Sequence, residues 1–322
     1  SLLANIAFGE REREPVNRLC GTFRPRELYV GYETSTFKKV TAFYADAARL
    51  PVQPKRRFVP LSTPVEEVVA LAEAERPDVL VGYGGWLDLF FRTVAARGLA
   101  LRPPKAVMYM GEALPHGARE LVEQRFGVPV LSRYNAVESF KIGYFCERAT
   151  GFHVHEDLCH VPVVDDDGRD AAPGVAGRVV ISNLVNRATV LISYPIGDLA
   201  AWRDASCGCG RTLRVLGELE GRVEDVVTLA DGRFVHPRAV WQVLKDDADV
   251  LQYQLTQHEP RRFELRLATL DGDAFARALA RPLPALRRLL GDDAVLDASR
   301  GALERGGGKF RAVVSHCRPA VG

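Results

Sequence analysis

Several short stretches of polar and glycine-rich residues could do chemistry on a nucleotide, and they follow one another in a fixed order. The Tyr134 ring, just after a predicted strand, could stack on a purine, an interaction worth about 1–3 kcal/mol per base in nucleic-acid complexes. Glu138 offers a hard anionic oxygen suited to Mg²⁺ between phosphates. Asp198 could accept two hydrogen bonds from a ribose diol. Lys309, in a glycine loop, could bring an ammonium to developing negative charge.

Each of these residues also has an ordinary structural interpretation. Tyr134 could fill the core, Asp198 could be a turn residue, and Lys309 could lie on the surface. The functional interpretation is favoured because these residues occur within five short stretches that follow one another in order. The stretches are Gly111-Glu112-Ala113-Leu114, Tyr134-Asn135-Ala136-Val137-Glu138-Ser139, Ser193-Tyr194-Pro195-Ile196-Gly197-Asp198, Gly221-Arg222-Val223-Glu224-Asp225 and Gly306-Gly307-Gly308-Lys309-Phe310-Arg311.

By order and spacing, these stretches resemble the adenylate-forming superfamily of acyl-CoA synthetases and adenylation domains, most closely its phenylacetate–CoA ligase-like branch. The resemblance covers residues 28–315. It implies that Lys309 is the adenylation lysine, that Glu138 holds Mg²⁺, and that Glu224 is the hinge about which a C-terminal unit rotates. The residues that the resemblance assigns to the nucleotide are Gly111, Glu112, Tyr134, Asn135, Asp198 and Arg222.

A pair of cysteines separated by one residue, Cys207 and Cys209, asks for a separate explanation. The resemblance extends to an upstream Cys146 and His153, and three thiolates with one imidazole would form a closed, structural tetrahedral zinc site. His155, Cys159 and His160 are rival ligands, and reduced half-buried thiols without metal are the alternative.

The acid substrate is the least specified part. Tyr83, Gly84 and Trp86 end a predicted core strand where the family has part of its acyl pocket, which would suit an aryl or small organic acid; core packing is the alternative.

The chain departs from the family in two places. The glycine-rich phosphate loop is missing, and residues 32–39 imitate it only superficially, without glycines. In the Tyr134 stretch, Asn135 stands where the family usually has Gly, and Val137 where it usually has Thr. An omitted N-terminal segment, a naturally reduced relative and a misleading resemblance are the explanations left open.

The elements that must position these residues follow from hydrophobic periodicity. We expect strands at 77–83, 106–110 and 128–132, alternating with helices at 41–50, 63–74, 86–97 and 115–126. This alternation predicts a mostly parallel sheet with crossover helices. Short strands at 152–154, 158–164, 177–183 and 189–194 predict an antiparallel β-subdomain. A hairpin at Asp231-Gly232, helices at 237–245 and 273–290, and strands at 250–257, 262–268 and 294–296 predict a small α+β unit.

We therefore expect an α/β protein with an adenylate-forming N-terminal domain at 1–223 and a mobile α+β lid at 224–322. Within the first domain, the sheet core is expected at 28–150 and the β-subdomain at 151–220.

Composition narrows the class of protein. The chain has 322 residues, 47% of them hydrophobic, and its net charge of +2 argues against a dedicated nucleic-acid or membrane-surface binder. Six cysteines are too few for a disulfide scaffold. The first residues lack a basic leader with a long apolar stretch, so we expect no signal peptide and a cytoplasmic location.

These observations favour an AMP-forming ligase that uses ATP, Mg²⁺ and coenzyme A on a small-molecule carboxylic acid, with neither nucleic acid nor membrane as partner and with a homodimer left open. An amine or other nitrogen nucleophile in place of coenzyme A, and a non-catalytic nucleotide-binding relative, are the alternatives. A further alternative is a zinc-dependent hydrolase that uses His153, His155 and Glu156, although a cysteine-rich ligand set argues against an open catalytic site.

Overall fold

The structure is a computed structural model, and it describes residues 2–48, 54–114, 116–186, 189–217, 219, 221–222, 225–244, 247–301, 303 and 310–317. The chain divides into two compact units, which we call the sheet unit and the second unit. The sheet unit comprises residues 1–159, 184–189 and 205–215, and the second unit comprises 160–183, 190–204 and 216–322.

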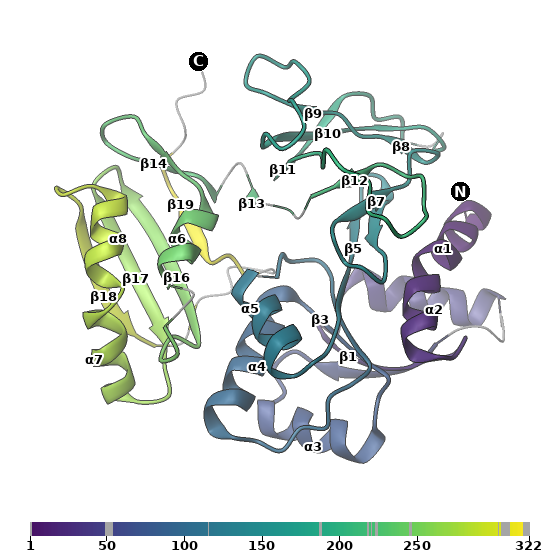
Figure 1. Cartoon of the computed structure of the whole chain (residues 1–322), viewed down its shortest axis with the longest axis horizontal. Coiled ribbons are helices and arrows are strands. Elements are labelled where there is room, and N and C mark those ends of the chain that lie inside the picture. Colours follow the sequence, from purple (N-terminus) through teal and green to yellow (C-terminus); the bar gives the residue numbers. More distant parts are fainter. Residues whose placement is uncertain are drawn as a thin grey trace. The chain divides into compact units, whose positions relative to one another are not determined.

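The sheet unit is built on a sheet with the strand order β12-β7-β6-β5-β4-β3-β1-β2 (Figure 1). The pairs from β2 to β5 are parallel, and those of β5 with β6 and β6 with β7 are antiparallel. The strands are β1 (Arg26–Gly31), β2 (Lys55–Pro60), β3 (Val79–Gly82), β4 (Ala106–Tyr109), β5 (Val130–Ala136), β6 (Phe140–Phe145), β7 (Phe152–Val154) and β12 (Val215–Leu216).

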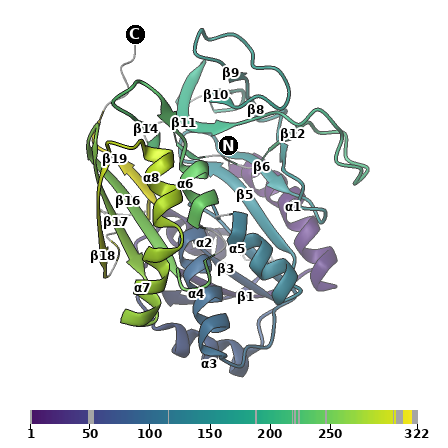
Figure 2. The same cartoon turned by 60° about the vertical axis from the view of Figure 1, so that its left-hand side comes forward.

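Strands β3 and β4 are buried at every residue, as expected for parallel strands that are covered on both faces. The predicted α/β fold and its mostly parallel sheet are confirmed. The helices of the unit are α1 (Leu2–Cys20), α2 (Thr36–Ala48), α3 (Val65–Glu75), α4 (Gly84–Arg97), α5 (His116–Glu120) and the π-helix η1 (Leu121–Arg125). Helices α3, α4 and α5 pack in sequence, whereas α1 contacts β4 and β6 (Figure 2).

Two local expectations in this unit need correction. Helix α2 begins at Thr36 rather than at residue 41, because Ser35 caps it by accepting a hydrogen bond of 3.2 Å from the Lys38 backbone N–H. Tyr134 does not begin a loop: β5 continues to Ala136, and only three residues separate it from the antiparallel strand β6.

The first sheet of the second unit has the strand order β13-β11-β10-β8, with β9 also paired to β10. Its strands are β8 (Cys159–His160), β9 (Val163–Val164), β10 (Gly177–Asn183), β11 (Tyr194–Ala200) and β13 (Gly221–Arg222). The predicted strand at 189–194 is wrong, since β11 begins where that prediction ends. The described residues before it, including Val190 and Ile192, are exposed, so their apolar character did not mark a buried strand.

The C-terminal part of the second unit has a hydrophobic core of its own. It contains the hairpin β14 (Val227–Thr228) and β15 (Phe234–Val235), which confirms the turn expected at Asp231-Gly232. A four-stranded sheet has the order β18-β17-β16-β19, formed by β16 (Gln252–Glu259), β17 (Arg262–Ala268), β18 (Val295–Arg300) and β19 (Val313–Ser315). Its helices are α6 (Pro237–Leu244), α7 (Gly272–Ala280) and α8 (Leu283–Leu290).

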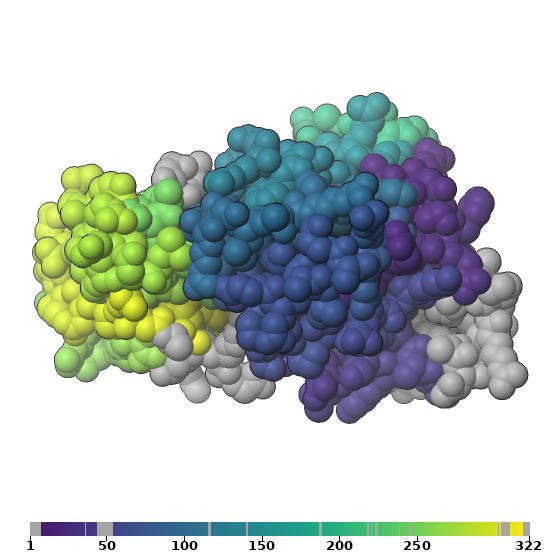
Figure 3. All heavy atoms as spheres, turned by 90° about the horizontal axis from the view of Figure 1, so that it is seen from below, coloured from purple at the N-terminus to yellow at the C-terminus, as the bar shows by residue number. Residues whose placement is uncertain are grey.

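Alternation along β17 builds this core. Phe263, Leu265 and Leu267 are buried, and the residues between them are not. Apolar residues of α6 and α8 complete the same cluster, and the described residues among 225–317 gather into one body (Figure 3, green to yellow). The helix predicted at 273–290, with a proline interruption, is found as two helices, because the chain turns at Arg281-Pro282, where a proline cannot continue the hydrogen bonding of α7.

Among the described residues, we find no helix with the combined length and apolar character that crossing a bilayer requires.

Candidate functional site

Two predicted site segments and one further aromatic residue lie at the carboxyl ends of adjacent parallel strands in the sheet unit. Tyr83 follows β3, and Gly111 and Glu112 come shortly after β4. Tyr32 follows the neighbouring strand β1. In open parallel sheets, ligands bind at this edge, where the strand-to-helix turns gather.

The turns at this edge are closely packed. The rings of Tyr32 and Tyr83 lie 5.0 Å apart, edge to face at 67°. The backbone N–H of Gly85 donates to Glu112 Oε2 at 3.3 Å. Gly111 has a φ of +79°, and a Cβ there would come within 2.8 Å of the Tyr83 ring. A non-glycine residue at 111 would therefore be strained and would collide with the ring.

Tyr83 is held with its hydroxyl in a buried hydrogen bond to Tyr29. Burial is the main cause that raises the pKa of Tyr83 far above its ordinary value. The phenol therefore stays neutral, and its ring is the surface that it can offer to a ligand. Tyr32 was not singled out from the sequence as a site residue; an aromatic residue directly after the buried strand β1 was the signal that could have found it.

Trp86, predicted to line the acid pocket, lies in the hydrophobic core. It is 3% exposed and stacks on Phe90, with ring centroids 4.9 Å apart. Gly84 is a point of close approach, because a Cβ at this position would lie 2.2 Å from the Ala113 carbonyl oxygen.

The hairpin of β5 and β6 carries the next group. Tyr134 is 5% exposed, and its ring packs 5.5 Å from Phe152. Asn135 is exposed at an irregularity in the β5–β6 register. Glu138 is half-buried in the turn, and the neighbouring Val137 is 80% exposed.

Asp198 and Arg222 face each other on paired strands of the second unit. They are register partners on β11 and β13, with Arg222 Nε 3.5 Å from Asp198 Oδ1. Asp198 is 8% exposed, whereas Arg222 is exposed. A carboxylate and a guanidinium are thus held side by side by backbone pairing, the combination expected for a ribose and a phosphate.

Two predicted residues, Lys309 and Glu224, lie outside the described residues. Their stretches are nevertheless joined, because Arg311 forms an ion pair with Asp225. The phosphate-loop-like segment at 32–39 forms a turn and the capped start of α2.

The cysteine and histidine residues predicted to bind metal come together in the sheet unit. One ligand atom from each of Cys146, His153, Cys207 and Cys209 lies within 4.8 Å of all the others. The Cys146 and Cys207 sulfur atoms are 3.4 Å apart, and Cys209 Sγ is 3.5 Å from His153 Nε2. Zinc–ligand bonds of about 2.0–2.3 Å in a tetrahedron require separations of this size, so the donor set fits zinc.

Local structure explains how these four side chains meet. Cys146 directly follows β6 and His153 lies in β7, so a turn returns the chain between them. Gly208 and Gly210 have φ angles of +67° and +85°, which let the loop fold tightly around Cys209.

The protonation tendencies of the cluster differ from ligand to ligand. Burial raises the pKa of the Cys146 thiol to about 12. Burial would also raise that of Cys209, but hydrogen bonds from the Arg211 backbone and side chain lower its pKa overall. Burial lowers the pKa of His153, so the imidazole is neutral and available to a metal.

Two of the three rival ligands have other partners, and the third, His160, is exposed. His155 Nε2 lies 3.3 Å from Glu12 Oε1, and Cys159 Sγ faces the backbone carbonyls of Lys141 and His155. Among the described residues, the Cys146–Cys209 cluster is the one group of at least three such side chains that could hold a metal. The hydrolase set of His153, His155 and Glu156 is therefore not brought together.

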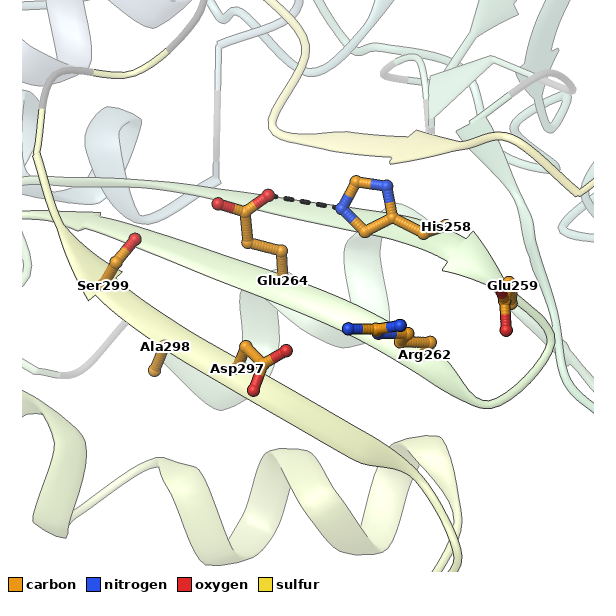
Figure 4. Close-up of a pocket in the computed structure, with 7 residues that line it drawn as sticks. All are labelled: His258, Glu259, Arg262, Glu264, Asp297, Ala298 and Ser299. Atoms are coloured by element: carbon orange, nitrogen blue, oxygen red, sulfur yellow. Dashed lines mark hydrogen bonds and ion pairs between the residues drawn. The ribbon is translucent and has the colours of Figure 1, made fainter.

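A hollow of about 440 Å³ lies on the polar face of the C-terminal sheet (Figure 4). Side chains from β16, β17 and β18 line it, among them Arg262 and Asp297, and His258 Nε2 lies 3.2 Å from Glu264 Oε2. No motif identified in the sequence falls in this hollow.

Comparison with known sequences gives one informative relative. No family model matches the chain. Over 198 residues the chain is 29% identical to phenylacetate–coenzyme A ligase of Thermus thermophilus. The match covers 59% of this chain and 44% of that protein, so the chain spans less than half the length of the curated relative that it matches.

Solved structures share the fold at low identity. 2-Hydroxyisobutyryl-CoA ligase in its postadenylation state matches with a TM-score of 0.71 and 18% identity, over 95% of this chain and 70% of that one. Anthranilate CoA ligase AuaEII gives a TM-score of 0.60 at 12% identity, over 89% and 58%. Amide bond synthetase McbA from Marinactinospora thermotolerans gives 0.57 at 15%, over 89% and 60%. The chain therefore shares its fold with these CoA ligases and this amide bond synthetase, and part of its sequence is similar to a phenylacetate–coenzyme A ligase.

Proposed function

We propose that this protein activates a carboxylic acid with ATP and transfers the acyl group to coenzyme A. In the first step a carboxylate oxygen attacks the α-phosphorus, the bond to the leaving pyrophosphate breaks, and an acyl-adenylate forms. In the second step the thiol sulfur of coenzyme A attacks the acyl carbon, the thiol proton is lost, and AMP leaves. The relative named phenylacetate–coenzyme A ligase supports coenzyme A over a nitrogen nucleophile as the acceptor.

The observation that carries this proposal is the pairing of Asp198 with Arg222. These residues come from stretches separated in the sequence, and the β11–β13 register sets them opposite each other. We assign the ribose hydroxyls to Asp198, and the neighbourhood of ribose and phosphate to Arg222. Backbone pairing holds both groups before a ligand arrives, which lowers the entropic cost of binding.

The remaining roles follow the family pattern. We assign the adenine to Tyr134 and Asn135 with Gly111 and Glu112. Glu138 would hold Mg²⁺, which offsets phosphate charge when bound.

Two further roles are proposed for the C-terminal residues: Lys309 stabilises charge, and residues 224–322 move as a lid. Lys309 would lie between the carboxylate and the α-phosphate and stabilise charge there. Residues 224–322 would act as the lid domain, rotating about Glu224. Their separate hydrophobic core supports a body that could move as one piece.

For the acid we propose an aryl or small organic acid that contacts the carboxyl ends of β1 and β3. The half-buried ring of Tyr32 offers apolar surface there, and it packs against the buried Tyr83, next to the close-packed Gly84. Trp86 is left out of this role because it is buried against Phe90.

We also propose a structural zinc ion held by Cys146, His153, Cys207 and Cys209. The short separations within the set and the neutral imidazole support it. Four protein ligands leave no open position, so zinc would stabilise the fold and take no part in the reaction.

Pyrophosphate release tests the activity. The full chain is incubated with ATP, Mg²⁺ and a panel of aryl, small organic and amino acids, with coenzyme A, with an amine or with no acceptor. Acid-dependent pyrophosphate release that coenzyme A accelerates is the expected result, and Lys309→Ala should nearly abolish it. Acceleration by the amine alone would favour the nitrogen-nucleophile alternative. ATP binding by calorimetry without acid-dependent release would favour a non-catalytic relative. The homodimer and the cytoplasmic location stay predictions.

A further inference from the structure

Arg211 joins three segments of the sheet unit that are distant in the sequence. Its guanidinium forms an ion pair with Glu14 of α1 and donates to Glu147 Oε2 at 2.9 Å. Arg211 also follows Cys209, one of the proposed zinc ligands, by two residues, and its guanidinium favours the thiolate form of that cysteine. Glu147 directly follows Cys146, so the Arg211–Glu147 contact links the segment that carries Cys146 to the segment that carries Cys207 and Cys209.

Charge explains why an arginine belongs at this position. Three thiolates, a neutral histidine and Zn²⁺ sum to a net charge of −1, which is costly in a partly buried site without a cation. Arg211 is a cation two residues from the Cys209 thiol, and its side chain is only 18% exposed. A planar guanidinium can donate to several acceptors in fixed directions, whereas a lysine ammonium cannot reproduce that fork.

The same contacts reach helix α1. Glu14 pairs with both Arg211 and Arg18, and Arg18 Nη1 lies 3.5 Å from Glu147 Oε1. The second half of α1 is therefore held against the cysteine segments by a network of two arginines and two glutamates. Displacing the Cys209 loop would pull Arg211 away from Glu14 and break this network.

We infer that Arg211 is a positioning residue that orients Cys209 for the metal and couples metal binding to the docking of α1. This inference rests on the proposed zinc site. Removal of zinc from the wild-type chain then loosens α1 around residues 14–20, at a distance from the ligands. Conversely, loss of the Arg211 side chain lowers the affinity of the site for zinc.

The test uses the full chain purified without chelator, with two readouts. Zinc content and the rate of zinc transfer to a colorimetric chelator report on the site, and hydrogen exchange of the α1 amides reports on docking. Arg211→Met should release zinc about 10- to 100-fold faster than the wild type, the range found when an outer partner of a ligand is lost. Arg211→Lys should fall between Arg211→Met and the wild type. The matched control Arg97→Met, which removes an exposed ion pair with Glu66 in the same unit, should leave both readouts unchanged.

Glu14→Gln keeps all zinc ligands and Arg211, so it tests the coupling between zinc and α1 even if Arg211→Met does not fold. In the wild type, chelation should speed α1 exchange, whereas in Glu14→Gln exchange should already be fast and chelation should add little. Normal zinc content with unchanged α1 exchange after chelation would overturn the inference alone. A wild-type chain without bound zinc would overturn the zinc site as well, without touching the proposed ligase activity.

Discussion

The Cys146–Cys209 cluster and the Asp198–Arg222 pair are built in different ways. The cluster gathers four side chains from the end of β6, from β7 and from a separate loop, with sulfur atoms as close as 3.4 Å. The pair consists of two residues facing each other across neighbouring strands, with Arg222 45% exposed on its side chain. The first arrangement depends on the fold and in turn holds it together. The second needs only one strand register and leaves its charged groups accessible.

This difference separates stability from activity. A closed metal site contributes its binding free energy to folding. An ion pair with an exposed partner contributes only about 0–1 kcal/mol, so stability alone does not account for the pairing of Asp198 with Arg222, which supports the ligand role proposed for them. Substitutions in the cluster should therefore affect unfolding first, and substitutions in the pair should affect nucleotide use first.

The largest effect is expected from Cys146→Ser. Loss of one buried thiolate opens the site, so zinc content should fall below one per chain and the free energy of unfolding should drop by roughly 3 kcal/mol or more. Metal analysis and denaturant titration measure both quantities. Cys159→Ser is the matched control, since Cys159 is buried but lies outside the cluster, and it should keep its zinc. Equal zinc loss in both variants would argue against the ligand assignment.

The next largest effect is expected from Glu12→Gln, because Glu12 forms a second set of contacts that hold α1, separate from those of Glu14. Burial would raise the pKa of Glu12, but a hydrogen bond with His155 and the charges of Lys141 and Arg133 lower it overall. The substitution leaves buried cations uncompensated and should cost about 3 kcal/mol at pH 7. Because the pKa of Glu12 is lower in the folded protein, its contribution is complete above the ordinary value of 4.5 and is lost as the pH falls below it.

Urea titrations between pH 7 and 3.5 check this prediction. The stability difference between wild type and Glu12→Gln should shrink as the pH falls. A difference that stays constant with pH would show that the charge of Glu12 is not what stabilises the helix.

Asp198→Asn should change activity with little change in stability. Loss of a charged acceptor for the ribose hydroxyls, worth about 1.5–3 kcal/mol, should lower kcat/KM for ATP about 10- to 100-fold. The free energy of unfolding should change by less than about 1 kcal/mol. Steady-state pyrophosphate release and denaturant titration give the two numbers, with the exposed turn variant Asp231→Asn as control. A large loss of stability with unchanged kcat/KM for ATP would show that Asp198 serves stability and not nucleotide use.

The smallest effect is expected from Asp249→Asn in the C-terminal part. Hydrogen bonds from Arg277, with help from Arg281, lower the pKa of Asp249 to about 2. Its contribution is therefore present above pH 3.8 and is lost only as the pH approaches 2. Both arginine partners of this carboxylate are more than half exposed, so the unfolding curve at pH 7 should barely move, and thermal scans provide the check. A shift as large as that of Glu12→Gln would mean that this surface group is more than a solvated ion pair.

The sequence predicted best those elements whose local signals agree with their burial. The bounds of β7, β10 and β17 match the predicted ranges, because turn residues flank them and β17 alternates between buried and less buried positions. β11 was missed because Val190 and Ile192 imitate a core strand, whereas the real strand begins with Tyr194 and Pro195. Helix α1 was missed because its charges and an internal proline conceal it. Contacts of Glu12 and Glu14 with distant residues stabilise it, and no local rule contains those contacts.

For the candidate site, the sequence predicted some residues well and others poorly, as it did for the fold. Family resemblance named Cys146 and His153 beside Cys207 and Cys209, but only the structure could bring four such separated side chains within bonding range. Trp86 was misjudged because a tryptophan after a strand looks the same in sequence whether it faces a ligand or Phe90. Tyr32 was overlooked because its neighbour in space, Tyr83, is far along the chain.

The contact between Gly84 and the Ala113 carbonyl bears on any attempt to retarget this protein. With 2.2 Å between that oxygen and the place a methyl group would occupy, even alanine at position 84 would push apart the turns that follow β3 and β4. A mutagenesis library that aims at new acids should therefore leave this glycine untouched and vary Tyr32, whose half-buried ring has room for exchange.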